Sequence, residues 1–199
     1  MWPWEHAAVG YLAYSLFCHT YYRESPGGLD AFAVLFGSVL PDLIDKPLAY
    51  QFGVFDTGYA LGHSIFFAIP LAILVGIGAR QLDRPRAGLA FAVGYLLHLP
   101  GDFVPHYLRG SERFDRVLWP LREAPGTTGT DGVADFTWMY FIDYWAALTS
   151  GDPPTYLVVQ TGMVVFTGLL WLYDGAPVLR ECLVTTRGAL GEAVGALSR

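Results

Sequence analysis

The sequence places a histidine and an aspartate, His98 and Asp102, four residues apart at the end of an apolar run. In a helix, residues at positions i and i+4 lie one above the other on the same face, so the two side chains would point at one object. Imidazole nitrogens and carboxylate oxygens suit zinc, and also manganese or iron. The pair therefore predicts a metal site at the end of this run.

More ionisable residues stand at the ends of the other apolar segments. His6 opens the first segment, Asp42 and Asp45 close the second, and His63 lies near the start of the third. If short connections make consecutive segments antiparallel, all these ends face the same side. Ionisable residues inside apolar helices are costly and are candidates for function by default. We therefore expect these side chains to meet around a cation at one face of a membrane.

The composition predicts a membrane protein, because 53% of the 199 residues are hydrophobic, 16% are aromatic and only 15% are charged. The third apolar segment is long enough, at ~1.5 Å per residue, to cross the ~30 Å hydrocarbon layer. The second is short and crosses only if it continues through Pro41. The apolar segments of the first half are His6 to Tyr22, Leu29 to Leu40, Gly58 to Ala79 and Ala87 to Val104.

The second half of the chain contains a polar loop, an aromatic segment and two further helical patterns. Asp135 to Trp145 is rich in aromatic residues and suits the headgroup layer, and Tyr156 to Tyr173 is a full-length apolar helix. Leucines and valines from Leu179 to Leu197 predict an amphipathic helix on the membrane or on the bundle. Small residues at four-residue spacing, Gly88 with Ala92 and Ala90 with Gly94, predict that the fourth helix approaches a neighbour closely.

These patterns predict an all-α integral membrane helical bundle with about five to six membrane helices, an interfacial segment and an amphipathic tail. The N-terminal residues lack the positive flank of a signal peptide, so we expect the first helix to be retained. The chain is expected to form one domain, with a metal-site core at 1–104, an interfacial part at 105–150, and the last membrane helix and tail at 151–199.

Charge and cysteine content exclude other classes. The formal net charge of −6 leaves no basic stripe to neutralise phosphates, which argues against nucleic acid. Cys18 and Cys182 are far apart in the sequence and do not suggest a disulfide framework. Membrane lipids and a small-molecule or lipid phosphoester substrate are the expected partners.

Five stretches resemble a known family, in the family's order: HAAVG at 6–10, GSVLPDLID at 37–45, GHS at 62–64, GYLLHLPGD at 94–102 and VLWPL at 117–121. The family is the membrane-bound metal-dependent hydrolases of the cytoplasmic membrane, of the type regulated by the SOS repressor. It is similar in turn to the helical zinc-dependent phospholipase C enzymes. The resemblance implies one or two zinc ions, with Asp102 bridging them, and the ligands His6, Asp42, His63, His98, Asp102 and His106.

The chain departs from the family pattern near the expected ligands. Pro100 and Gly101 stand where the family has apolar helix formers, so the helix is expected to bend between His98 and Asp102. Lys46 stands where the family often has a histidine. A second metal therefore rests on fewer matching residues than the first.

Hydrolysis of a phosphoester follows from such a site, because a bound metal lowers the pKa of its water from ~15.7 toward ~7. Asp42 or Asp45 would orient or deprotonate this water, or Asp45 would instead hold a histidine ligand. The arginines of the following loop, Arg109, Arg113, Arg116 and Arg122, either neutralise phosphate or keep the loop soluble. Trp138 would rest at the acyl boundary.

Two other functions stay open, a metal transporter or sensor and a structural bundle clamped by a metal. Transporter sites usually lie near the bilayer midplane, whereas the expected ligands gather at helix ends. This difference in depth favours the hydrolase.

Overall fold

The structure, a computed structural model, describes residues 1–107, 114–126 and 132–197, without the side chains of 104–107, 136 and 189–197. Within these ranges the chain is all-helical, as predicted, with seven α-helices and no strand. The elements are α1 (Pro3–Phe17), a π-helical turn η1 (Cys18–Tyr22), α2 (Gly28–Tyr50), α3 (Ile65–Gln81), α4 (Pro85–Tyr107), a 3-10 turn η2 (Phe114–Val117), α5 (Val133–Leu148), α6 (Thr155–Tyr173) and α7 (Leu179–Leu197).

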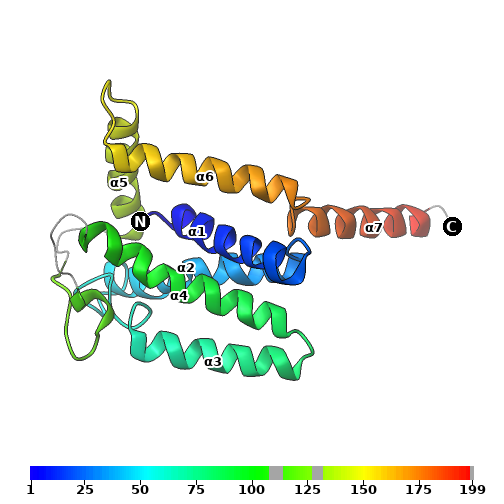
Figure 1. Cartoon of the computed structure of the whole chain (residues 1–199), viewed down its shortest axis with the longest axis horizontal. Helices are drawn as coiled ribbons and strands as arrows, with labels where there is room; N and C mark the ends of the chain where they lie inside the picture. Colours follow the sequence, from blue (N-terminus) through cyan, green and yellow to red (C-terminus); the bar gives the residue numbers. More distant parts are fainter. Residues whose placement is uncertain (108–113, 127–131, 198–199) are drawn as a thin grey trace.

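Helices α1 to α4 and α6 form one bundle (Figure 1). The central helix is α4, which packs against α1, α2 and α3, while α6 packs against α1. Figure 1 also shows α5 running across the end of the bundle where the chain starts, and α7 extending away from the opposite end. The antiparallel arrangement expected from the short connections is confirmed, so the start of α1, the end of α2, the start of α3 and the end of α4 lie together.

Two helix boundaries differ from the sequence pattern. Helix α2 continues through Pro41 and Pro47, and so reaches 23 residues. Helix α3 begins only at Ile65, where Ser64 caps it by accepting a hydrogen bond from the backbone of Phe66. The prediction of one apolar helix over Gly58 to Ala79 is therefore wrong for its first turns. Asp45 accounts for the difference, because its carboxylate binds backbone N–H groups of this connection that a helix would use internally.

Glycines let α2 and α4 approach each other closely. A Cβ atom added at Gly94 would overlap the backbone carbonyl of Val34, and one added at Gly37 would come within 2.5 Å of the carbonyl oxygen of Phe91. Gly88 stands similarly close to Gly76 of α3. The close approach predicted from small residues at four-residue spacing is confirmed.

The bundle is apolar outside and polar inside at one end. On α3, Phe66, Ile69 and Ile73 are exposed, and on α6 the exposed residues include Val159 and Leu169. Buried ionisable groups include Glu5, His6, Asp42, Asp45, His63, His98 and Asp102. Among the described helices, α6 is long and apolar enough to cross a membrane, and α3 is apolar but shorter. On this measure the described part of the chain has one clear membrane-spanning helix, α6, where five to six were expected.

The aromatic segment and the tail are both helical. Helix α5 contains the predicted stretch Asp135 to Trp145, and its Tyr144 meets the stacked rings of Trp2 and Trp4 edge-on. The tail forms α7 as predicted, and its Glu181 reaches Gly28 at the start of α2. Cys18 and Cys182 are both free, which agrees with the sequence.

We predict that Gly94→Ala destabilises the bundle by about 1–3 kcal/mol, because the added methyl group pushes α4 away from Val34. The matched control is Gly168→Ala in α6, where an added Cβ meets no atom within 4 Å. Both changes bring the same gain in helix propensity. The midpoint of thermal unfolding in detergent measures the effect. Equal midpoints for the two variants would contradict the close contact.

Candidate metal centre

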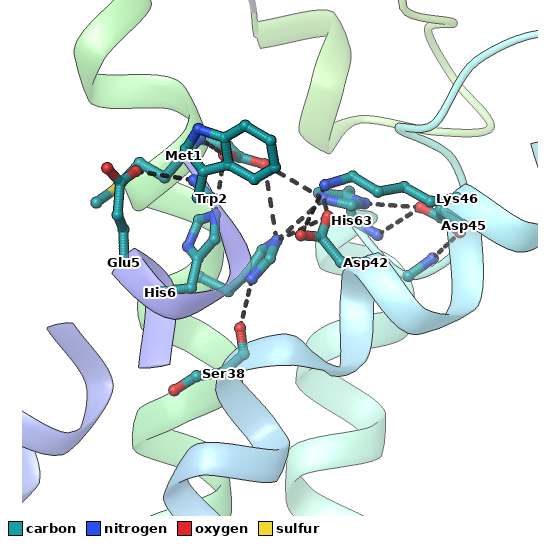
Figure 2. A network of polar contacts seen from close by, with 12 residues as sticks. Met1, Trp2, Glu5, His6, Ser38, Asp42, Asp45, Lys46 and His63 are labelled. Carbon is teal, nitrogen blue, oxygen red and sulfur yellow. Dashed lines mark hydrogen bonds and ion pairs between the residues drawn. The ribbon is translucent and has the colours of Figure 1, made fainter. Parts of the chain in front are cut away.

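Four buried side chains from three parts of the bundle converge at its end. They are Asp42 of α2, His63 of the connection before α3, and His98 and Asp102 of α4, and one ligand atom of each lies within 4.8 Å of all the others. Each residue is at most 5% exposed. Figure 2 shows Asp42 and His63 facing each other across this cluster. The convergence predicted from the sequence therefore exists for these four residues.

The spacing of the four donor atoms matches one metal ion. The Nε2 atom of His63 is 3.5 Å from Asp42 Oδ1 and 3.4 Å from Asp102 Oδ2, and the Nε2 atom of His98 is 3.8 Å and 3.7 Å from the same oxygens. Ligands placed tetrahedrally at ~2.0–2.1 Å from zinc are ~3.3–3.4 Å apart. The cluster needs only small adjustments to reach that geometry.

Both histidines present an Nε2 lone pair to the same point. His98 Nδ1 lies 2.7 Å from the carbonyl oxygen of Ser38, and His63 Nδ1 lies 2.8 Å from Asp45 Oδ2. Since each Nδ1 donates its proton to an oxygen, each Nε2 is left as the acceptor. The two Nε2 atoms are only 3.1 Å apart. A proton or a metal cation between them is needed to remove the repulsion of their lone pairs.

Asp45 acts on the site through the connection before α3. Its oxygens accept hydrogen bonds from the backbone N–H groups of Ala60, Gly62 and His63, in addition to the His63 imidazole. Tyr95 of α4 holds the same connection by donating to the carbonyl oxygen of Gly62. The sequence left Asp45 with two roles, and its contacts fit the holding of a histidine ligand.

The charge around His63 favours a cation. Burial alone would lower the pKa of this imidazole, but its interactions with the carboxylates of Asp102, Asp42 and Asp45 outweigh burial and raise the pKa to about 10. His63 therefore carries a proton when no metal is bound, and a metal ion would take the place of that proton.

His6 stands beside the four-residue cluster. Its Nε2 atom is 3.0 Å from Asp102 Oδ1, the oxygen that also lies 2.6 Å from the amino group of Met1. The ring of His6 stacks on His98 at 3.7 Å between centroids. Gly101 allows this packing, because a Cβ there would come within 3.0 Å of His6 Nδ1. Asp102 thus directs one oxygen to the cluster and the other to His6, as a bridging carboxylate would.

The expected bend in α4 does not separate the pair on which the site depends. Helix α4 continues through Pro100 to Tyr107. His98 and Asp102 stay in contact at the i, i+4 spacing, with 3.7 Å between Nε2 and Oδ2. Lys46, which stands in α2 where the resembled family often has a histidine, places its ammonium group 2.8 Å from Asp42 Oδ2. A fixed positive charge therefore stands next to one ligand carboxylate.

A cavity of about 520 Å³ opens beside the cluster. Asp42 and Asp102 form part of its wall, and aromatic side chains of α1, α5 and α6 form much of the rest, among them Trp2, Tyr144 and Tyr156. Arg116 of η2 also lines it and lies over the ring of Tyr59, with 4.2 Å from its guanidinium carbon to the ring centroid. The cavity thus has charged groups next to the cluster and aromatic walls around them.

Several residues singled out from the sequence are not at this cavity. Trp138 is 63% exposed, stacks on Phe141 and is not part of the cavity wall. Arg109 and Arg113, as well as the side chain of His106, lie outside the described residues. Arg116 is one of the loop arginines considered for phosphate from the sequence, and it does line the cavity. Neither Trp2 nor Tyr59 was a candidate from the sequence. A tyrosine four residues before His63 was the available signal for Tyr59.

We predict that Asp45→Asn lowers the affinity of the protein for zinc by about 10–100-fold, because His63 loses the carboxylate that orients it. The control is Asp56→Asn, which changes an exposed carboxylate in the same connection and should leave the affinity unchanged. Competition with a chelator measures the affinity, and circular dichroism checks the helix content. Wild-type affinity in Asp45→Asn would contradict the orienting role.

Comparison with known sequences agrees with a membrane location. The profile of the YdjM inner membrane protein family matches residues 1–178 and so covers all the residues of the cluster and the cavity. Comparison with curated proteins and with solved structures found no match. Because the family profile covers most of its length, the chain belongs to the YdjM inner membrane protein family.

Proposed function

We propose that this inner-membrane protein is a metal-dependent hydrolase that cleaves a phosphoester bond in a phospholipid-like substrate. The observation that carries the proposal is the juxtaposition of a four-donor cluster with a cavity into which two of the donors, Asp42 and Asp102, open. Four protein donors close a tetrahedral site, so a catalytic water needs a fifth coordination position, and the cavity beside Asp42 and Asp102 is the side from which water would reach the ion.

Zinc is the ion that we assign to the cluster. Two imidazole nitrogens and two carboxylate oxygens are borderline donors at tetrahedral spacing, which suits zinc better than calcium or magnesium and leaves manganese and iron as competitors. When bound, such an ion acidifies a coordinated water and polarises a phosphoryl oxygen. His6 and the outer oxygen of Asp102 are the groups that would contribute to a second ion.

Asp42 is the residue that we assign to orienting the attacking water or accepting its proton. Its Oδ1 atom faces the cluster, so the oxygen that would act on the water is Oδ2, which lies 2.8 Å from Lys46 Nζ on a side chain that borders the cavity. Asp45 has no such freedom, because both of its oxygens accept hydrogen bonds from the connection before α3. We therefore assign Asp45 to positioning His63.

A lipid substrate is supported by the position and walls of the cavity. The cavity lies at the end of the bundle, between the ligand cluster and α5, with apolar residues such as Leu43 and Leu157 among the aromatic rings. Ester bonds of lipid headgroups lie at the end of a membrane-spanning bundle, next to the acyl chains. An amphiphilic substrate would place its polar group at the cluster and its apolar part along these walls.

We also propose that α1 to α4 cross the membrane together with α6. Helices α2 and α4 contain 23 residues each, about 35 Å at 1.5 Å per residue. Their outward positions are apolar, as at Phe32, Phe36 and Leu89. Their site residues reduce the mean hydropathy but face the interior, where intramembrane charges are normally found. Helix α5, which runs across the bundle end, is assigned to the headgroup layer.

A metal-binding membrane protein without hydrolase activity is the alternative function. A transporter would hold its ion near the middle of the membrane on broken helices. The cluster lies instead in the second half of α2 and α4, next to His6 near the start of α1, and α4 is continuous through it. These features favour hydrolysis over transport.

We predict that His98→Ala and Asp42→Asn lose bound zinc and release neither headgroup nor diacylglycerol from phospholipid vesicles, whereas the wild type does both. The loss of zinc affinity should exceed the ~10–100-fold effect of changing a residue that only orients a ligand. The control is His19→Ala, because His19 lies at the opposite end of the bundle with Asp174. Elemental analysis gives the metal content, and phosphorus and lipid assays follow hydrolysis.

The outcomes separate the functions. Hydrolysis by a zinc-free His98→Ala variant would overturn the proposal. Bound zinc without hydrolysis of any phospholipid tested would favour the alternative, and zinc uptake into proteoliposomes would identify transport.

A further inference from the structure

We propose that Arg116 binds the phosphoryl anion of the substrate and thereby sets the specificity of the cavity; this inference rests on the proposed function. The guanidinium group lies over Tyr59 and lines the cavity together with the ligand carboxylates Asp42 and Asp102. Two of its nitrogens are buried and form no hydrogen bond with any described residue.

The unpaired donors of Arg116 are the central observation. Its Nε and NH1 atoms are both shielded from solvent, and neither has a hydrogen-bond partner among the residues that the structure describes. Burying charged donors without acceptors is costly, so such donors in a cavity wall call for an acceptor from outside the chain. Two exposed arginines of the described residues do have carboxylate partners, Arg86 with Glu24 and Arg180 with Glu181.

Tyr59 holds Arg116 next to the cluster. The guanidinium carbon lies 4.2 Å from the centre of the tyrosine ring, and the same ring meets His63 edge-on at 4.9 Å between centroids. Stacking on an aromatic face fixes the plane of a guanidinium group while leaving its N–H edge free. An anion on that edge therefore sits beside the metal ligands and not in the outer part of the cavity.

The nearby carboxylates do not satisfy Arg116, because each has another partner. Asp42 contacts Lys46 and the histidines of the cluster, and Asp102 contacts His6 and the amino group of Met1. Nε and NH1 stand on opposite sides of the guanidinium group, and each can join NH2 in two parallel hydrogen bonds to two oxygens of a phosphoryl group. Lys46 adds a second positive charge to the same cavity wall.

The test uses the purified, zinc-loaded full chain in detergent and measures binding without turnover. Calorimetric titration with inorganic phosphate and with a soluble short-chain phosphatidic acid compares the wild type with Arg116→Gln and Arg116→Lys. Arg122→Gln is the matched control, because Arg122 is exposed in the same loop. Zinc content and the midpoint of thermal unfolding are measured for each variant, so that loss of the fold or of the metal is recognised.

We expect Arg116→Gln to weaken binding of at least one probe by about 10–100-fold. Arg116→Lys should recover part of this loss, since it keeps the charge but not the fork. The control should change affinity less than twofold, roughly the effect of an exposed charge. Loss with both probes identifies the phosphoryl group as sufficient, and loss with the lipid alone identifies a lipid phosphate as the ligand.

Two results would overturn the inference: no binding of either probe by the wild type, or equal binding by wild type and Arg116→Gln. The proposed function fails in a different way. A protein that binds phosphate through Arg116 but hydrolyses no phospholipid would refute the hydrolase and keep the anion site. Hydrolysis that does not depend on Arg116 would refute the anion site and keep the hydrolase.

Discussion

The fold brings four buried lone-pair donors together, and these donors need a cation between them to offset their mutual repulsion. Two imidazole nitrogens and two carboxylate oxygens stand within 4.8 Å of one another, away from water. The imidazoles cannot turn away, because Ser38 and Asp45 hold their outer nitrogens. Electrostatic repulsion at this distance is strong in a medium of low dielectric constant. A proton relieves it in part, and a divalent metal would relieve it more completely.

The bundle is built to hold these groups together. Gly37 and Gly94 let α2 and α4 come close enough for Asp42 to meet His98 and Asp102. Asp45, one turn further along α2, fixes the connection that brings His63 to the same point. Outward-facing residues of α3 and α6 are largely apolar, and the buried His and Asp side chains of the cluster gather inside one end of the bundle. This distribution is what a membrane-embedded site requires.

The cavity offers a ligand both charged groups and apolar walls. The cluster supplies buried negative charge, and Arg116 and Lys46 supply positive charge on the cavity wall beside it. Aromatic rings of the N-terminal segment, α5 and α6 line the same cavity. An anionic headgroup with an apolar tail matches this order of surfaces. Because the chain belongs to an inner membrane protein family, ligands of this kind are present in its surroundings.

Periodicity and spacing in the sequence determined the all-helical class, the close packing at small residues of α4 and the placement of Asp42, His63, His98 and Asp102 on one side of the bundle, because these features follow from local geometry. The late start of α3, the orienting contacts of Asp45 and the stacking of Arg116 on Tyr59 were decided by the tertiary structure. Each joins an irregular connection to a distant element. No repeating pattern records such contacts, since they arise only when the helices have packed.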